Sequence, residues 1–430
     1  MNEELVIVSP TSKFNIYLYL RKAANKFLGI LNFLPLAIVV GCLSMPAGLL
    51  ILQTIYHPLE DKIKFLDGAP LSGAPETVKW PSLNLKQLIS GEWQRLYEQW
   101  LTLKIPFRVS VIRLHNQFYY NIFAASYMYQ PIGLAIGKYN YLYPLAMIID
   151  YCNPSTNNTK EALEAWTREI QVLADFFKKR SQQFIYMISP SKTSYYPEYF
   201  PRNYAITGAC HHQPYIPLRN ISKKPLALAS IDVRENIMQA KSQYGYLLFP
   251  HNGLHWTKLG SAIATQAFIA QLNVIMGKHF PVLNYSFKAS NEEKGGDNDL
   301  IYLANLFRTN FNYPSAVVDI NYPPLKKTKP FKLAVVGDSM SAGIIERLIE
   351  TKLFDQIDYY FYYDREHKRS VNSGPLITLP ENESNKYEAL LSADVVVLEE
   401  NEVLRGTQHA ELLFESVIGR PSLFKKYIKQ

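Results

Sequence analysis

Several features that would assign a protein class at once are missing from this 430-residue sequence. Three cysteines are too few for a disulfide framework, although Cys152 and Cys210 can pair in an oxidising compartment, while Cys42 lies in an apolar segment. The net charge of +8 is spread along the chain, without a dense Lys/Arg block interleaved with aromatic residues. Nucleic acid is therefore not an expected partner. No repeat period is evident, which argues against a solenoid.

Charged residues are absent from one long run, residues 27 to 55. The run covers about 29 positions, whereas roughly 20 apolar residues suffice to cross a bilayer. A cleaved signal peptide is the alternative, but the run is too long, starts too late and lacks a clear small-residue cleavage site before Tyr56. We therefore predict one transmembrane helix over residues 27–55.

Charge on either side of this helix predicts its orientation. Three basic residues, Arg21, Lys22 and Lys26, precede it, whereas the charges that follow it roughly cancel. The positive-inside rule then places residues 1–26 in the cytoplasm and the rest of the chain outside the inner membrane, in the periplasm. Residues 56–79 contain Gly and Pro and are predicted to be a linker. Residues 80–430 are predicted to form one extracytoplasmic domain, and they are enough for a sizeable core.

Within that domain, amphipathic helices alternate with short, apolar, β-branched runs. Such alternation is typical of an α/β fold, with a largely parallel sheet covered on both faces and function at the carboxyl ends of its strands. The aromatic content of 13% suggests an aromatic core or a sugar-binding surface, and core is favoured. Residues 284–299 are polar and Gly-rich and are predicted to be a surface loop or a flexible insertion. The predicted strands are 184–188, 246–249, 333–336, 357–362 and 395–398, and the main helices are 160–183, 231–242, 255–276 and 387–391.

The segment from Phe331 to Leu348 organises the domain. A short apolar strand stops at Gly337-Asp338-Ser339, and small residues then open a helix with apolar periodicity. A serine at such a turn lies at the carboxyl edge of the sheet, next to the free N–H groups of a helix N-terminus. Ser339 is therefore our candidate nucleophile, although a turn serine is often only a helix cap.

Two further polar groups follow predicted strands. His255, in the stretch His251 to Ser261, follows the predicted strand 246–249 and can serve as the base that a serine nucleophile needs. Asn401 follows the strand 395–398, and its side chain, together with the Ser339 amide, is a candidate oxyanion donor. The alternatives are a buried structural histidine next to Trp256 and an ordinary turn asparagine.

These residues resemble the SGNH-type esterase fold and, more closely, its permuted branch of AlgX/AlgJ-like polysaccharide O-acetyltransferases. In that branch an Asp-x-His-Trp block precedes a Gly-Asp-Ser-like block, as His255-Trp256 precedes Ser339 here. The likeness extends over roughly residues 80–430, including Pro190-Ser191-Lys192. It implies a three-layer α/β/α domain with a mainly parallel sheet. It also implies work outside the cytoplasmic membrane, commonly beside a multispanning O-acyltransferase.

One position departs from the family pattern. The family aspartate lies two residues before the histidine, where this chain has Gly253. Asn252 is a weak substitute, because a neutral amide stabilises an imidazolium less than a carboxylate does. Three alternatives follow: a Ser–His dyad, a second carboxylate that fills the place, or an inactive scaffold.

The resemblance and the candidate residues together predict acyl transfer without a cofactor or a metal. Ser339 takes an acetyl group, and a polysaccharide hydroxyl activated by His255 receives it. The expected partners are a polysaccharide acceptor and a multispanning membrane O-acyltransferase that supplies acyl groups. An esterase that uses water in the second step, or a degenerate glycan-binding or assembly factor, are the alternatives.

Overall fold

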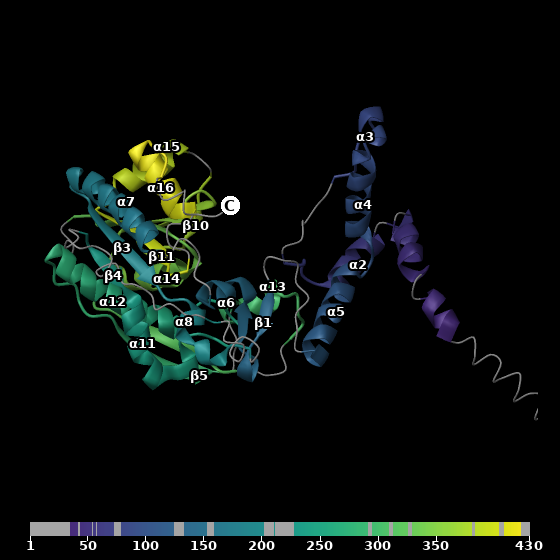
Figure 1. The fold of residues 1–430 in the computed structure, drawn as a ribbon, viewed down its shortest axis with the longest axis horizontal. Coiled ribbons are helices and arrows are strands. Elements are labelled where there is room, and N and C mark those ends of the chain that lie inside the picture. The colour runs from purple at the N-terminus through teal and green to yellow at the C-terminus, as the bar shows by residue number, and fades with distance from the viewer. Residues whose placement is uncertain are drawn as a thin grey trace, which may run out of the picture. The chain divides into compact units, whose positions relative to one another are not determined.

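The computed structural model in Figure 1 describes the chain from Pro35 to Ser422, with several gaps. The described residues are 35–41, 44–53, 55–56, 58–72, 79–123, 133–152, 159–201, 210, 228–290, 295–308, 313–325, 329–380, 383–403 and 408–422. They divide into two compact units, which meet between His115 and Asn116. We call them the N-terminal and the C-terminal unit. The division falls later in the sequence than the predicted boundary at residues 79 and 80.

All the regular secondary structure described in the N-terminal unit is helical. Its first helix, Pro35–Gln53, has a mean hydropathy of 2.2 and is long and apolar enough to cross a membrane, a test that a signal sequence also passes. Residues 1–34, including the basic flank used for the orientation, lie outside the described residues, as does Cys42. The predicted linker contains a helix, α2. The helices that follow are α2 (Pro58–Asp67), α3 (Leu85–Ile89), α4 (Glu92–Lys104) and α5 (Arg108–Phe123), of which α5 continues into the C-terminal unit.

A sheet lies at the centre of the C-terminal unit (Figure 1). It has seven strands in the order β10-β9-β8-β7-β11-β3-β4. The five strands from β8 to β4 run parallel, and the β9–β10 edge is antiparallel. The predicted α/β class with a mainly parallel sheet is therefore confirmed. The strands are β3 (Gln183–Ser189), β4 (Ser230–Asp232), β7 (Lys332–Gly337), β8 (Gln356–Phe361), β9 (Glu366–Val371), β10 (Ile377–Thr378) and β11 (Val395–Asn401).

Both faces of this sheet are covered because its central strands are apolar on both sides. In β7, Leu333 and Val335 pack into the core beneath α11, α12 and α14, whereas Ala334 and Val336 pack into the core beneath α7, α15 and α16. Helix α12 is apolar enough to resemble a membrane span, but 61% of that stretch is buried, as expected of a core helix. The helices are α7 (Lys160–Lys179), α11 (Val233–Tyr244), α12 (Lys258–Met276), α14 (Ser339–Thr351), α15 (Glu383–Leu391) and α16 (Gln408–Ile418).

Two small antiparallel sheets, the β1–β2 hairpin and the β5–β6 pair, and several short helices complete the unit. The predicted strand 246–249 is wrong, because a 3-10 helix, η4, and a turn occupy that position; the chain there serves as the entry to α12. The predicted surface loop 284–299 is also wrong, since it contains β5, η5 and the start of α13. The elements are β1 (Leu134–Ile136), η1 (Lys138–Asn140), β2 (Leu142–Pro144), α6 (Leu145–Cys152), α8 (Lys192–Tyr195), η3 (Pro197–Tyr199), η4 (Gly245–Leu247), β5 (Asn284–Ser290), η5 (Gly295–Asn298), α13 (Asp299–Leu303) and β6 (Ser315–Asn321).

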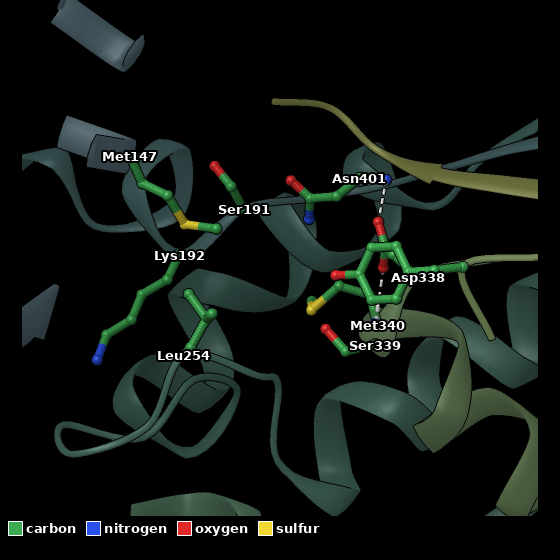
Figure 2. A pocket seen from close by; sticks show the side chains of 9 residues that line it. Met147, Ser191, Lys192, Leu254, Asp338, Ser339, Met340 and Asn401 are labelled. Atoms are coloured by element: carbon green, nitrogen blue, oxygen red, sulfur yellow. Dashed lines mark hydrogen bonds between the residues drawn. The ribbon is translucent and has the colours of Figure 1, made fainter. Parts of the chain in front are cut away.

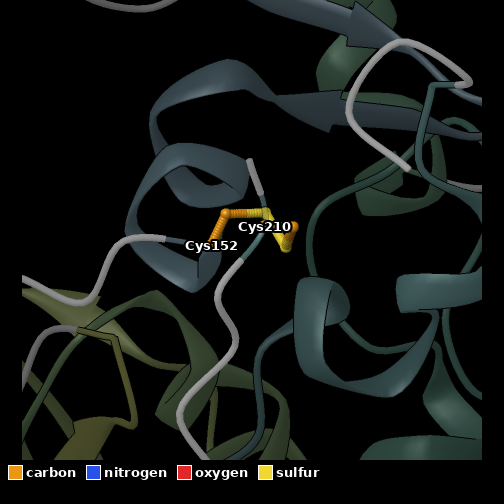
Figure 3. The surroundings of a disulfide bond; sticks show 2 residues. All are labelled: Cys152 and Cys210. Carbon is orange, nitrogen blue, oxygen red and sulfur yellow. A yellow bond between two sulfur atoms is a disulfide. The ribbon is translucent and has the colours of Figure 1, made fainter. Parts of the chain in front are cut away.

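A disulfide joins Cys152, at the end of α6, to Cys210 (Figure 3). The pairing of these two cysteines, which the sequence left as one option, is thus present in the structure. Disulfides of this kind persist in oxidising compartments.

Candidate active site

Ser339 is the first residue of α14, directly after the turn that ends β7. The preceding Asp338 caps the helix: its Oδ1 accepts a hydrogen bond of 2.8 Å from the Met340 N–H, and its Oδ2 accepts one of 2.8 Å from the Asn401 N–H (Figure 2). The Asp338 carboxylate therefore ties the start of α14 to the end of β11. This fixes the serine at the carboxyl edge of two neighbouring strands.

His255 lies in the loop between η4 and α12, and its Nε2 is 2.7 Å from the Ser339 Oγ. The predicted contact between serine and histidine is therefore present, although the histidine follows a turn and not a strand. Thr257 caps α12 through its side chain and so fixes the end of this loop. The imidazole is held within reach of the serine proton.

The other ring nitrogen of His255 contacts a carboxylate. Asp299 Oδ2 is paired with His255 Nδ1, and Asp299 Oδ1 accepts a hydrogen bond of 2.7 Å from the Leu254 N–H. The weak assignment of Asn252 to this position is therefore corrected: its side-chain amide is directed to Asn298, at 3.4 Å. The carboxylate of Asp299, 44 residues after the histidine, therefore contacts the imidazole in the way expected of the family aspartate, whose sequence position is Gly253 in this chain.

Asp299 is held in position by local packing. It is the first residue of α13, whose Leu300 and Ile301 are buried in a small core with residues of α5 and the β1–β2 hairpin. The Leu300 N–H donates a hydrogen bond of 3.1 Å to the Asn252 carbonyl. Asn252 therefore contributes to the site by joining α13 to the histidine loop. Asn116 Nδ2 donates to the Ala304 carbonyl at the other end of α13.

Lys192 also stabilises the loop that carries His255. Its buried Nζ donates three hydrogen bonds, to the carbonyls of Leu142, His251 and Gly253, at 2.9, 2.9 and 2.7 Å. Three acceptors use all three N–H bonds of the ammonium form. Burial lowers the pKa of Lys192, and the Asp299 carboxylate works in the opposite direction. The lysine thus joins the β1–β2 hairpin to the residues just before His255.

A pocket of about 50 Å³ opens beside the Ser339 side chain (Figure 2). Asn401 borders it, as predicted, and its Nδ2 donates to the Pro190 carbonyl at 2.9 Å, with a longer contact of 3.5 Å to Ser189 Oγ. A volume of this size holds only a few water-sized groups. The other lining residues are Met147, Ser191, Lys192, Leu254, Asp338, Met340 and Tyr362.

Tyr362 lines this pocket in an uncommon backbone conformation. Its φ is +46° and that of Tyr363 is +64°, both in the left-handed region that non-glycine residues rarely adopt. Such conformations cost free energy and cluster at functional sites. Burial raises the pKa of the Tyr362 phenol, and hydrogen bonding with the Ser339 side chain works against that increase. The phenol is therefore placed next to the candidate nucleophile.

A buried carboxyl group, Glu399, lies behind the serine turn. Its Oε1 is 2.6 Å from Ser189 Oγ, and its Oε2 accepts a hydrogen bond of 3.2 Å from the Asp338 N–H. Burial and the nearby Asp338 carboxylate raise the pKa of Glu399 well above its ordinary value. The protonated form is thus favoured, which avoids two adjacent buried negative charges.

Sequence reasoning missed Asp299, Tyr362 and Glu399. Asp299 stands in the polar stretch taken for a loop, and one weak signal was available: an Asn-Asp pair followed directly by the apolar Leu300 and Ile301. That pattern is common at helix starts and does not by itself identify a partner for a distant histidine. Among the described residues, no group of three or more His, Cys, Asp or Glu side chains is arranged to hold a metal ion.

Ser339, His255 and Asp299 are linked by hydrogen bonds near the carboxyl edge of the parallel sheet. Residues of these three types in this order are chemically capable of serine acyl transfer. No protein-family model matches the chain, and no curated protein matches its sequence. Solved structures do match, and AlgJ and AlgX, which the sequence resemblance named, are among them.

The O-acetyltransferase domain of Pseudomonas putida AlgJ is 17% identical, with a TM-score of 0.40 over 63% of this chain and 91% of that one. Pseudomonas aeruginosa AlgX is 13% identical, with a TM-score of 0.42 over 66% and 65%. Bacillus cereus PatB1 with a sulfonyl adduct is 12% identical, with a TM-score of 0.41 over 60% and 95%.

Proposed function

We propose that this protein is an O-acetyltransferase that carries an acetyl group on Ser339 and delivers it to hydroxyl groups of an exported or cell-surface polysaccharide. The observation that carries the proposal is the hydrogen-bonded series Ser339–His255–Asp299. It supplies a nucleophile, a base and a carboxylate that orients the base, which are the parts that serine acyl transfer requires.

In the first half-reaction, Ser339 Oγ attacks the carbonyl carbon of an acetyl donor while His255 Nε2 takes the hydroxyl proton. The negative charge of the tetrahedral intermediate falls near the N-terminus of α14, where the first N–H groups have no partner within the helix. The proposed oxyanion donors are the Ser339 N–H and the side-chain amide of Asn401, one of whose N–H groups stays on the Pro190 carbonyl while the other makes only the long contact to Ser189 Oγ. Breakdown of the intermediate releases the donor's leaving group, which receives the proton from His255, and leaves acetyl on Ser339.

In the second half-reaction, a sugar hydroxyl gives its proton to His255 and attacks the acetyl carbon. The bond to Ser339 Oγ breaks, and the serine recovers its proton. The Asp299 carboxylate accepts the hydrogen bond from His255 Nδ1, which holds the Nδ1–H tautomer, and it stabilises the imidazolium that forms twice in each cycle. The pocket of about 50 Å³ beside Ser339 has room for an acetyl group.

The proposed location is outside the inner membrane, with residues 1–26 in the cytoplasm and the helix Pro35–Gln53 as part of a single-pass anchor. The Cys152–Cys210 disulfide supports an oxidising compartment. The proposed acyl source is a multispanning membrane O-acyltransferase, as the sequence resemblance implies.

Two alternative functions are separated by one experiment. The full chain, in detergent, is mixed with an activated acetyl ester and a panel of oligosaccharides, and the fate of the acetyl group is followed by mass spectrometry. Acetylated oligosaccharide that requires Ser339 supports the proposal. Free acetate with every acceptor indicates an esterase, and a folded protein that forms neither product indicates a degenerate glycan-binding or assembly factor.

A further inference from the structure

Most of the tryptophan in this chain is concentrated in a short part of the N-terminal unit. Three of the five tryptophans, Trp80, Trp93 and Trp100, fall within 21 residues. The other two, Trp166 and Trp256, are buried in the core of the C-terminal unit. The clustered tryptophans are not needed to fill a comparable core, since α3 and α4 contain no buried residue.

These aromatic rings form one connected surface. Trp93, Tyr97 and Trp100 follow one another at helical spacing on α4, and Trp93 stacks on Tyr97 with ring centroids 5.2 Å apart. Trp80 packs edge-on against Trp100 at 4.6 Å and is itself 59% exposed. We call these four residues the α4 aromatic face.

Exposed aliphatic residues lie between Trp80 and Trp93 in the sequence. Leu83, Leu85 and Ile89 are 77%, 72% and 80% exposed. Leu85 and Ile89 lie one turn apart on α3, so they point to the same side of that helix. Apolar side chains exposed in this number mark a surface that another apolar phase covers.

The charge of the same stretch is positive. Residues 79–113 contain six Lys and Arg but only two acidic residues, Glu92 and Glu98. Basic residues close to a bilayer surface are attracted to anionic lipid headgroups, by about 1 kcal/mol for each Lys or Arg. A combination of Trp, Tyr, aliphatic and basic side chains is typical of helices at the membrane–water interface.

One hydrogen bond connects this stretch to the candidate membrane helix. Gln53, the last residue of the helix Pro35–Gln53, donates from Nε2 to the carbonyl of Lys104, the last residue of α4, at 3.0 Å. Trp100 lies about one helical turn, roughly 5 Å, before Lys104. If the apolar helix crosses the bilayer, the end of α4 lies where that helix leaves the hydrocarbon region.

We propose that the α4 aromatic face, with Leu85 and Ile89 of α3, lies in the headgroup region of an anionic lipid bilayer on the side where the apolar helix emerges. This surface is an interfacial contact additional to the transmembrane helix. The inference rests on the membrane location given under the proposed function but does not depend on catalysis.

The test uses the full chain in liposomes of phosphatidylcholine and phosphatidylglycerol whose acyl chains carry bromine near the headgroup end. Bromine quenches tryptophan only at short range. The variant Trp166→Phe/Trp256→Phe, which keeps the three interfacial tryptophans, is expected to lose about half or more of its emission in brominated compared with ordinary liposomes. The matched variant Trp80→Phe/Trp93→Phe/Trp100→Phe, which keeps only the buried pair, is expected to show no such loss.

Three results would overturn the proposal. Protein that floats with the liposomes but shows no quenching of the three tryptophans would reject the interfacial face while leaving the anchor intact. Protein that fails to float with them would reject the membrane helix and the face together. Equal quenching of both variants would show that the contact is not specific to this face. The Ser339→Ala variant should be quenched like wild type, so loss of catalysis and loss of membrane contact remain distinguishable.

Discussion

The two halves of the candidate site are built in different ways. The nucleophile side is local: β7, Asp338 and the start of α14 follow one another directly, so strand, cap and serine are adjacent in the sequence. The base side joins three distant pieces, since His255, Asp299 and Lys192 come from separate segments and meet through hydrogen bonds to the loop 251–254. When catalytic residues are adjacent in the sequence, they form a motif that can be recognised from the sequence. When they come from distant segments, one residue can be replaced by another from elsewhere in the chain, and no sequence motif records the change.

The largest expected effect on activity comes from replacing Ser339, the nucleophile of the locally encoded half of the site. In Ser339→Ala no acetyl adduct should form with an activated acetyl ester, and turnover should fall by about a millionfold, as for loss of a serine nucleophile elsewhere. Intact-mass spectrometry checks this. The matched control is Ser341→Ala, because the Ser341 hydroxyl donates to the Asp338 carbonyl and is not among the residues that line the pocket. An adduct that persists in Ser339→Ala would place the nucleophile elsewhere.

A smaller effect is expected from the phenol beside the nucleophile. Tyr362→Phe removes a polar group from the pocket wall while keeping the ring, and should lower the acylation rate by about tenfold, the scale of one hydrogen bond in the transition state. Tyr363→Phe is the control, since Tyr363 has the same left-handed backbone but bonds to Ser416 Oγ at 2.6 Å. Equal rates for the two variants would deny Tyr362 a part in acylation.

The buried carboxyl behind the serine should show its effect in stability and pH. Glu399 has a raised pKa in the folded protein, so its favourable protonated state is present at low pH and is lost as the pH rises through that pKa. Glu399→Gln mimics the protonated form and should be more stable than wild type at pH 8, by on the order of 1 kcal/mol. The difference should shrink towards pH 5. Chemical denaturation at both pH values measures it, and a variant less stable at pH 8 would show that the carboxylate is needed.

The smallest effect is expected at the position where the family pattern has its aspartate. Gly253→Asp would restore an Asp-x-His pair, but Asp299 already occupies the His255 Nδ1 side. The rate should therefore stay within about twofold of wild type. A large gain in turnover would mean that Asp299 does not do the work of the missing carboxylate.

The sequence was sufficient for the parts of the fold whose signals are local. Apolar alternation and breaks predicted β3, β7, β8 and β11, and the parallel sheet follows from their alternation with helices. The prediction of a strand at residues 246–249 was wrong because a short apolar run does not distinguish a strand from a buried turn. Ser339, His255 and Asn401 were found because each lies a few residues after a short apolar run and because the serine and histidine blocks resemble a family motif.

Asp299 was missed for a physical reason. Its role depends on α13 packing Leu300 and Ile301 against the β1–β2 hairpin and on the bond from Leu300 to the Asn252 carbonyl. Contacts between segments this far apart leave no periodic signal in one sequence. The glycine at position 253, where the family has its aspartate, indicated that another carboxylate was needed. It did not indicate which residue of the chain supplies that carboxylate.

The central claim is that Asp299 is the carboxylate that orients His255, the general base. Single-turnover acetylation of Ser339 tests this claim most directly. The rate of adduct formation on Ser339 is followed by rapid mixing and intact-mass detection in wild type, Asp299→Asn and Asp297→Asn. Asp297 is a nearby acid whose side chain bonds to Ser315, and it is the control. Asp299→Asn should acylate about ten-thousandfold more slowly, because the imidazole loses its orienting charge, while Asp297→Asn stays close to wild type. A folded Asp299→Asn variant that acylates at the wild-type rate would contradict the account.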